Sequence, residues 1–313
     1  MGNKFKYCVE KLDIHYNFYI YNASTISNPQ NNTILFLKKE NQELTDSLKG
    51  IKESIIILKK GLNGEFLKEN NLVIYSDNPR YLYAKLLTEI LLENKKETKI
   101  FFKNGYYYGE NFQCEDNVVI EPFVIIGNNV SIKEGTIIKS GVKIGNNVSI
   151  GKNCYIRENS VIGGEGFGIE KDEFGNNFRI PHIGGVVIKD NVEVGALTTV
   201  CSGTIESTIV NEYVKIDDHV HVGHNVFVDE NSSLVAGTII GGSTMLGKNC
   251  RTAPNTAIKN GLKIGNNVIF GMSARVLKDV ENNQVLTNEK ADTLENIRKF
   301  SKIKEKLLQE NEE

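Results

Sequence analysis

An isoleucine recurs at every sixth position through a long middle stretch of this chain. The unbroken run is Ile120, Ile126, Ile132, Ile138, Ile144, Ile150, Ile156 and Ile162. Neither the α-helix, with about 3.6 residues per turn, nor the β-strand, with side chains that alternate, produces this period. A period of six is typical of a hexapeptide β-helix, in which three short strands form one coil and successive coils stack.

The apolar series continues beyond this run, after two interruptions. It resumes at Ile188, Val194 and Val200, and then runs from Val210 to Val276 with Thr252 as its one polar member. Four residues after most of these positions comes a smaller residue, as at Val130 and Val220, and this order suits a narrow interior. Gly and Asn between the hexads, as at 127–129 and 145–147, tolerate the positive φ of a tight corner.

These patterns predict a mainly β protein whose central domain, residues 104–280, is a parallel β-helix. Insertions into such a coil are tolerated at its corners, where they project outward. We expect an inserted loop at 163–185 and a four-residue offset between Val200 and Val210. Such excursions often carry function on repeat proteins.

The flanking segments lack the hexad. Residues 1–103 are expected to form a small α/β domain, in which a helix that starts near Asp77 and Pro79 follows three strands. The candidate strands are Thr33–Leu37, Ser54–Leu58 and Leu72–Tyr75. Residues 281–313 are expected to form a helical tail, because apolar residues recur at helical spacing between Asp292 and Gln309.

Composition excludes several classes of function. The 313 residues carry a formal charge of −2, so no basic excess points to nucleic acid. No apolar stretch near the N-terminus is long enough for a membrane span or a signal peptide, and we expect a cytoplasmic protein. The five cysteines lie far apart. Cys154 and Cys250 occupy inward positions of hexads, which predicts small core residues rather than a metal site or a disulfide.

Three of the five histidines crowd into the segment 219–224. Val220 and Val222 fall on inward positions, so His219 and His221 should point outward, with His224 near the next corner. If the β-helices of several subunits associate side by side, these histidines would line the cleft between subunits.

Several short motifs recur in a fixed order along the chain. They are Asp77-Asn78-Pro79, Gly166-Phe167-Gly168, residues 179–188, Gly195-Ala196, Lys215-Ile216-Asp217 and Gly223-His224-Asn225-Val226. Together they resemble one family, the UDP-3-O-(3-hydroxyacyl)glucosamine N-acyltransferases of lipid A biosynthesis. The resemblance implies a homotrimer of left-handed parallel β-helices. It also implies transfer of a 3-hydroxyacyl group from acyl carrier protein to a nucleotide-linked amino sugar, with no further cofactor and with a nucleotide-sugar site in the N-terminal domain.

The resemblance also implies the site residues. His224 would be the general base that takes a proton from the attacking amine, a role that suits a neutral imidazole near pH 7. Asp217 would hold its ring. Gly242 lies three hexads after His224, so it should stack beside the histidine and offer its N–H to the oxyanion. The expected substrate-binding residues are Phe36, Gly166, Phe167, His182, His221 and Asn225.

The sequence departs from the family pattern at three places. A second family histidine is replaced by Gly261, and an Asp-Arg-Gly segment is replaced by residues 201–203. The uracil-binding Phe-Leu-x-Asn-Pro-x-Tyr keeps only Phe36 and Leu37. These departures favour an acyltransferase with a related but altered acceptor or donor.

Three other functions are compatible with the sequence. Residues 271–280 resemble the final coil of acetyltransferases that use acetyl-CoA on the amine or hydroxyl of a nucleotide sugar. His182, His219 and His224 could supply the zinc ligands of a gamma-class carbonic anhydrase. A non-catalytic prism that serves as a scaffold is the third alternative.

Overall fold

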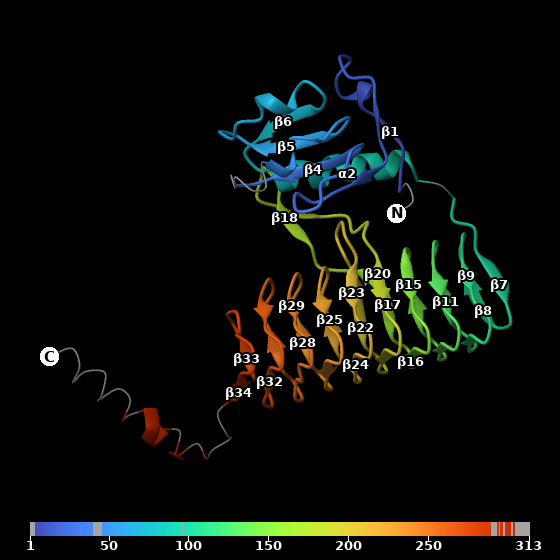
Figure 1. The fold of residues 1–313 in the computed structure, drawn as a ribbon, viewed down its shortest axis with the longest axis vertical. Coiled ribbons are helices and arrows are strands. Elements are labelled where there is room, and N and C mark those ends of the chain that lie inside the picture. Colours follow the sequence, from blue (N-terminus) through green and yellow to red (C-terminus); the bar gives the residue numbers. More distant parts are fainter. Residues whose placement is uncertain are drawn as a thin grey trace.

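The chain forms a long triangular prism with a smaller α/β domain above its middle (Figure 1). This computed structural model describes residues 4–39, 46–95, 97–288, 293, 295–296, 298–301 and 303. Most of the predicted C-terminal helix lies outside the described residues, and the described positions 295–296, 298–301 and 303 are helical. In the described part, no helix is both long enough and apolar enough to cross a membrane.

The N-terminal domain is built on a parallel four-stranded sheet. Its strands are β3 (Asn22–Ala23), β4 (Thr33–Leu37), β5 (Ile55–Lys59) and β6 (Leu72–Ser76), and a hairpin of β1 (Tyr7–Cys8) and β2 (Tyr19–Ile20) lies beside them. Helix α2 (Pro79–Glu93) covers one face and begins at an Asn78 cap, whose Oδ1 accepts a bond of 3.2 Å from the Tyr81 N–H. Ile34, Ile55 and Ile57 face this helix.

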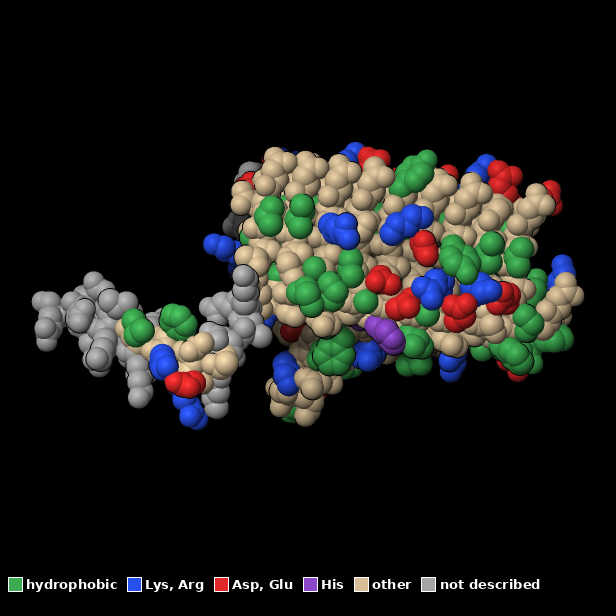
Figure 2. Space-filling view, turned by 90° about the horizontal axis from the view of Figure 1, so that it is seen from below, with side chains coloured by type: hydrophobic (Ala, Val, Ile, Leu, Met, Phe, Trp, Pro, Cys, Tyr) green, Lys and Arg blue, Asp and Glu red, His purple; other side chains and the backbone are tan. Residues whose placement is uncertain are grey.

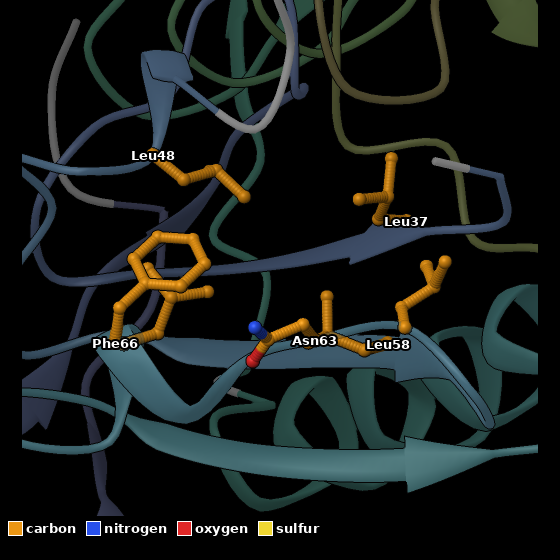
Figure 3. A pocket seen from close by; sticks show the side chains of 7 residues that line it. Leu37, Leu48, Leu58, Asn63 and Phe66 are labelled. Atoms are coloured by element: carbon orange, nitrogen blue, oxygen red, sulfur yellow. The ribbon is translucent and has the colours of Figure 1, made fainter. Parts of the chain in front are cut away.

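The opposite face of the sheet is closed by its own apolar cluster. Short 3-10 turns, η1 (Val9–Lys11) and η2 (Glu65–Leu67), flank the sheet. The hollow in Figure 3 is lined by Leu37, Leu48, Leu58, Leu62, Asn63, Phe66 and Leu67. Its volume is about 10 Å³, which is room for about one water molecule at most, so this face is packed core rather than a ligand site.

Three parallel sheets form the faces of the prism, a left-handed parallel β-helix. The ten-stranded face consists of β7 (Phe101–Lys103), β8 (Tyr106–Tyr108), β11 (Ile125–Ile126), β14 (Lys143–Ile144), β17 (Val161–Glu165), β22 (Thr199–Ser202), β25 (His221–Val222), β28 (Ile239–Ile240), β30 (Ala257–Ile258) and β33 (Arg275–Val276). Its first strand, β7, is antiparallel to β8.

The other two faces repeat the same pairing. The eight-stranded face consists of β9 (Gln113–Cys114), β12 (Ser131–Ile132), β15 (Val148–Ile150), β20 (Val186–Ile188), β23 (Thr208–Val210), β26 (Phe227–Val228), β29 (Met245–Leu246) and β31 (Lys263–Ile264). The six-stranded face consists of β10 (Val119–Ile120), β13 (Ile137–Ile138), β16 (Tyr155–Ile156), β21 (Glu193–Val194), β24 (Lys215–Ile216) and β27 (Ser233–Leu234). Isolated bridges at Arg251 continue it to β32 (Ile269–Phe270), which pairs with β34 (Val285–Leu286).

The periodic residues fill the interior, as the sequence predicts. Ile126, Ile156 and Val228 are buried, and so are the small residues that follow, such as Cys154. Thr252 is also buried, and its hydroxyl bonds to the Val235 N–H at 2.9 Å and to the Thr238 hydroxyl at 2.8 Å. The one polar hexad position is therefore satisfied inside the core.

Asparagines at the corners take the positive φ that the sequence predicts. Asn129 and Asn147 have φ of 56° and 58°. The Nδ2 of Asn129 donates to the Oδ1 of Asn147 in the next coil at 3.1 Å. These stacked amides add side-chain bonds along the corner to the backbone pairing of the faces.

Both interruptions of the hexad hold the N-terminal domain on the prism. The inserted loop forms an antiparallel hairpin, β18 (Ile169–Lys171) and β19 (Asn177–Arg179), and the Phe178 ring packs edge-on against Tyr81 of α2 at 5.4 Å. Ile205 in the second excursion joins the core of the N-terminal domain. Beside it, Glu206 accepts a bond of 2.8 Å from the Thr25 hydroxyl. The excursions are therefore docking elements.

Candidate active site

A cavity of about 370 Å³ lies where the N-terminal domain, the inserted loop and four coils of the prism meet. The prism residues come from the corner between the ten-stranded and eight-stranded faces. The lining residues are Arg80, Gly166, Phe167, Gly168, Ile169, Cys201, His221, Gly223, His224, Gly242, Ser243 and Asn260. Of the residues predicted to form a site, the cavity brings together Gly166, Phe167, His221, His224 and Gly242.

A hydrogen-bond network fixes the tautomer of His224. Its Nδ1 lies 2.9 Å from the Asn225 Oδ1. That same oxygen accepts bonds from the Thr204 backbone N–H at 3.1 Å and from the Thr204 hydroxyl at 2.9 Å. Because a backbone N–H can only donate, the Asn225 atom is an acceptor and Nδ1 must carry the hydrogen. The Nε2 of His224 is then left with a free lone pair.

Two glycines enclose the His224 ring. A Cβ atom at Gly242 would lie 2.6 Å from the Nε2 of His224, and one at Gly166 would lie 2.8 Å from the His224 Cβ. Side chains at these positions would displace the imidazole. In the described part of the chain, no acceptor bonds to the Gly242 N–H, so this N–H can serve an oxyanion near Nε2.

His182 lies behind the loop of Gly166 and Gly168, in edge contact with His224. The two ring centroids are 5.4 Å apart. The Nδ1 of His182 donates to the Ile180 carbonyl at 2.9 Å, and its buried Nε2 has no partner among the described residues. Burial, reinforced by the neighbouring His224, lowers the pKa of His182 to about 4. His182 is therefore neutral at pH 7.

The other two histidines of the segment 219–224 lie in different surroundings. His221 faces the cavity, and its Nδ1 lies 2.7 Å from the Thr199 hydroxyl. Burial, followed by the proximity of His224, lowers the pKa of His221. His219 has a φ of 58° and lies at the opposite end of this strand, at the corner with the six-stranded face. The prediction that His219 and His221 point outward agrees with this arrangement.

Known proteins resemble the prism and much of the rest of the chain. Residues 129–164 match the family model "Bacterial transferase hexapeptide (six repeats)". The UDP-3-O-acylglucosamine N-acyltransferase of Campylobacter lari is 44% identical over 217 residues, which is 67% of this chain and 68% of that protein. The chain belongs to the UDP-3-O-acylglucosamine N-acyltransferase family. It is accordingly a hexapeptide-repeat acyltransferase.

Another N-acyltransferase and more distant solved structures are also similar to the chain. The N-acyltransferase of Methylococcus capsulatus is 48% identical over 88 residues, which cover 28% of this chain and 25% of that protein. The UDP-N-acetylglucosamine acyltransferase of Francisella novicida superposes with a TM-score of 0.50 at 26% identity, over 57% of this chain and 63% of that one. The UDP-N-acetylglucosamine O-acyltransferase of Moraxella catarrhalis has a TM-score of 0.53 over 63% of this chain and 76% of that one, and at 19% identity it supports the fold alone.

Two residues predicted for the site of this acyltransferase lie away from the cavity. Asp217 accepts bonds from the Asp218 N–H at 2.8 Å and the Ala236 N–H at 3.1 Å, and it lines a separate hollow on the six-stranded face. Within one chain, Asn225 and not Asp217 bonds to the His224 ring. Phe36 packs against Tyr83 inside the N-terminal domain, with ring centroids 5.0 Å apart.

The cavity also contains residues that the sequence did not single out. Arg80, Ser243 and Asn260 line it, and Thr204 holds Asn225 from behind. Arg80 follows the Asn78-Pro79 helix start, which was a visible signal for its place. Thr204 carries no such signal, because its position depends on the course of the irregular segment after β22.

The histidines of the zinc hypothesis do not converge within one chain. Across the described residues, no group of three or more His, Cys, Asp or Glu side chains is placed to hold a metal ion. The Nδ1 atoms of His182 and His224 are both engaged by oxygen acceptors, and His219 lies at another corner. All five cysteines are free thiols, and burial raises the pKa of Cys201 beside the cavity.

Replacement of Gly242 by alanine is expected to reduce acyl transfer by about 100-fold or more, because the new methyl group displaces the His224 ring and disturbs the oxyanion donor. Initial rates of acyl transfer measure the effect, with thermal unfolding as a check that the variant is folded. Gly50→Ala is a matched control, since no atom lies within 4 Å of a Cβ there. A Gly242→Ala enzyme with the wild-type rate would contradict this geometry.

The pKa of His182 predicts a pH dependence of stability. Its folded-state pKa of about 4 lies below the ordinary value of 6.5. As the pH falls from about 6.5 to about 4, the unfolded state therefore binds a proton that the folded state does not, and stability declines. Urea unfolding at several pH values across this window should show a shallower decline for His182→Gln than for the wild type. Parallel declines in the two proteins would show that His182 does not contribute.

Proposed function

We propose that this N-acyltransferase moves a 3-hydroxyacyl group from acyl carrier protein to the amine of a nucleotide-linked amino sugar, with His224 as general base. The observation that carries this proposal is the free Nε2 of His224, held beside the unbonded N–H of Gly242 in the cavity. The amine-acylating relatives support the acceptor class, since the Campylobacter lari protein is named for a UDP-linked acylglucosamine.

The reaction proceeds by addition and elimination. The sugar amine attacks the thioester carbonyl carbon, and the Gly242 N–H stabilises the negative oxygen of the tetrahedral intermediate. The Nε2 of His224 takes a proton from the attacking nitrogen, while Asn225 keeps Nδ1 protonated and the ring in place. The C–S bond then breaks, and the proton on Nε2 passes to the departing thiolate.

The neighbouring histidines favour this chemistry by staying uncharged. Burial lowers the pKa of both His182 and His221. At neutral pH they therefore add no positive charge that would oppose the protonation of His224.

We further propose that the enzyme is a homotrimer. Exposed hydrophobic side chains lie on the ten-stranded and six-stranded faces and the corner between them, including Val119, Ile125, Ile137, Tyr155, Leu197, Ile239 and Ile269. Figure 2, which views the prism from below, shows hydrophobic side chains among Lys, Arg, Asp and Glu side chains on this side. Among the described residues, Met245 is the one exposed large hydrophobic residue on a strand of the eight-stranded face. Association through the two apolar faces would also bring the Asp217 side of one subunit toward the His221 side of another.

Replacement of His224 by alanine is expected to lower turnover by about 10²–10⁴-fold, the usual contribution of a general base. The assay uses acyl carrier protein thioesters and CoA thioesters against a panel of nucleotide amino sugars. His15→Ala, at an exposed histidine of the N-terminal domain, is the control and should leave the rate unchanged. An unchanged rate in His224→Ala would remove the mechanism. Turnover with acetyl-CoA and none with acyl carrier protein would replace the proposed donor.

The trimer makes a separate prediction. Ile137→Glu buries a carboxylate in the proposed interface, so light scattering should show a mass below three times 35.0 kDa together with a loss of turnover. Met245→Glu places the same charge on the eight-stranded face and should leave both mass and rate unchanged. A fully active wild-type protein of 35.0 kDa would refute the trimer.

A further inference from the structure

Arg80 is the one charged side chain that lines the catalytic cavity in the described part of the chain. It is the second residue of α2, so the N-terminal domain brings it to the site from above the prism. One third of its side chain is exposed, which leaves the guanidinium accessible to a ligand. The steps proposed above assign the proton to His224 and the oxyanion to the Gly242 N–H, so none of them uses this cation.

The ion pairing of Arg80 leaves a positive charge unbalanced. The Nη1 of Arg80 lies 3.4 Å from the Glu170 Oε2, and the Nζ of Lys38 lies 3.4 Å from the same oxygen. Burial tends to raise the pKa of Glu170, but Lys38 and Arg80 outweigh it and hold this pKa below its usual range. Glu170 is therefore ionised at pH 7. One carboxylate cannot neutralise two cations, so the cluster of Lys38, Arg80 and Glu170 keeps a net positive charge at the cavity.

The available donors match a phosphate group. A guanidinium has five N–H donors in a planar fork, and it binds two oxygens of a phosphate at once. Glu170 contacts one terminal nitrogen of Arg80, at a distance too long for a tight bond, so most of the fork remains available. Ile169, which is partly buried, lines the cavity together with Arg80.

We propose that Arg80, supported by Lys38, is a phosphate-binding subsite that anchors a substrate while its reactive group lies at His224. This inference rests on the proposed function, in which two substrates carry such a group. The nucleotide-linked amino sugar has a diphosphate, and the donor has the phosphodiester of its pantetheine arm. Both groups present the same kind of phosphate oxygen to the guanidinium, and kinetics distinguish between them.

The first test measures binding without turnover. Titration calorimetry with inorganic pyrophosphate should show that Arg80→Gln weakens binding by about tenfold or more, as expected for loss of a charged hydrogen-bonding partner. Arg80→Lys should recover part of the affinity, because it keeps the charge but not the fork. Lys85→Gln, at an exposed position on the same helix, is the matched control and should bind like the wild type. Equal binding by wild type and Arg80→Gln would overturn the subsite.

Steady-state kinetics then identify the occupant. An increase of about tenfold in KM for the nucleotide sugar, with kcat nearly unchanged, would assign the subsite to the acceptor, because binding shared by ground and transition states alters KM alone. The same increase for the donor alone would assign it to the pantetheine phosphate. If neither KM changes, the subsite is refuted. A wild-type protein that binds pyrophosphate through Arg80 but acylates no amino sugar would refute the proposed function and leave the subsite standing.

Discussion

Parallel backbone pairing between successive coils is the interaction on which the rest of the structure depends. Each strand bonds in register with the strand of the same face in the next coil, as in the pairing of Ile125 with Lys143. Inward side chains of successive coils therefore stack on one another and form a continuous column of aliphatic residues inside the prism. The same register fixes the site, because it places Gly242 one coil after His224 and directly against its ring.

The N-terminal domain forms one wall of the cavity, and the prism forms the other. A bare corner of a β-helix would present His224 to solvent on a convex edge. Here the inserted hairpin and the second excursion carry α2 over that corner, and Arg80 and Ile169 close one side of the cavity. The interruptions of the hexad thus serve the site indirectly, because they hold a second wall opposite the histidine.

The hexad made most of the prism predictable, including the burial of Ile156 and the proximity of Gly242 to His224. Both features follow from the six-residue spacing, so the spacing alone was enough to predict them. The partner of His224 was not predictable in this way. Asp217 follows the periodic Ile216 and was expected to hold the ring, but within one chain its carboxylate accepts bonds from the Asp218 and Ala236 N–H groups. Asn225 is held by Thr204, whose place depends on a segment without the repeat.

That irregular segment joins the N-terminal domain to the surroundings of His224. Thr204 bonds to the amide oxygen that orients His224, while the next two residues, Ile205 and Glu206, attach to the N-terminal domain. The Lys4 ammonium also approaches the Ile205 carbonyl at 3.5 Å. Three adjacent residues thus contact both the N-terminal domain and the hydrogen-bond network that sets the tautomer of His224. A shift of the N-terminal domain relative to the prism would be transmitted to His224 through this one segment. The rigid coils of the prism would not have to change.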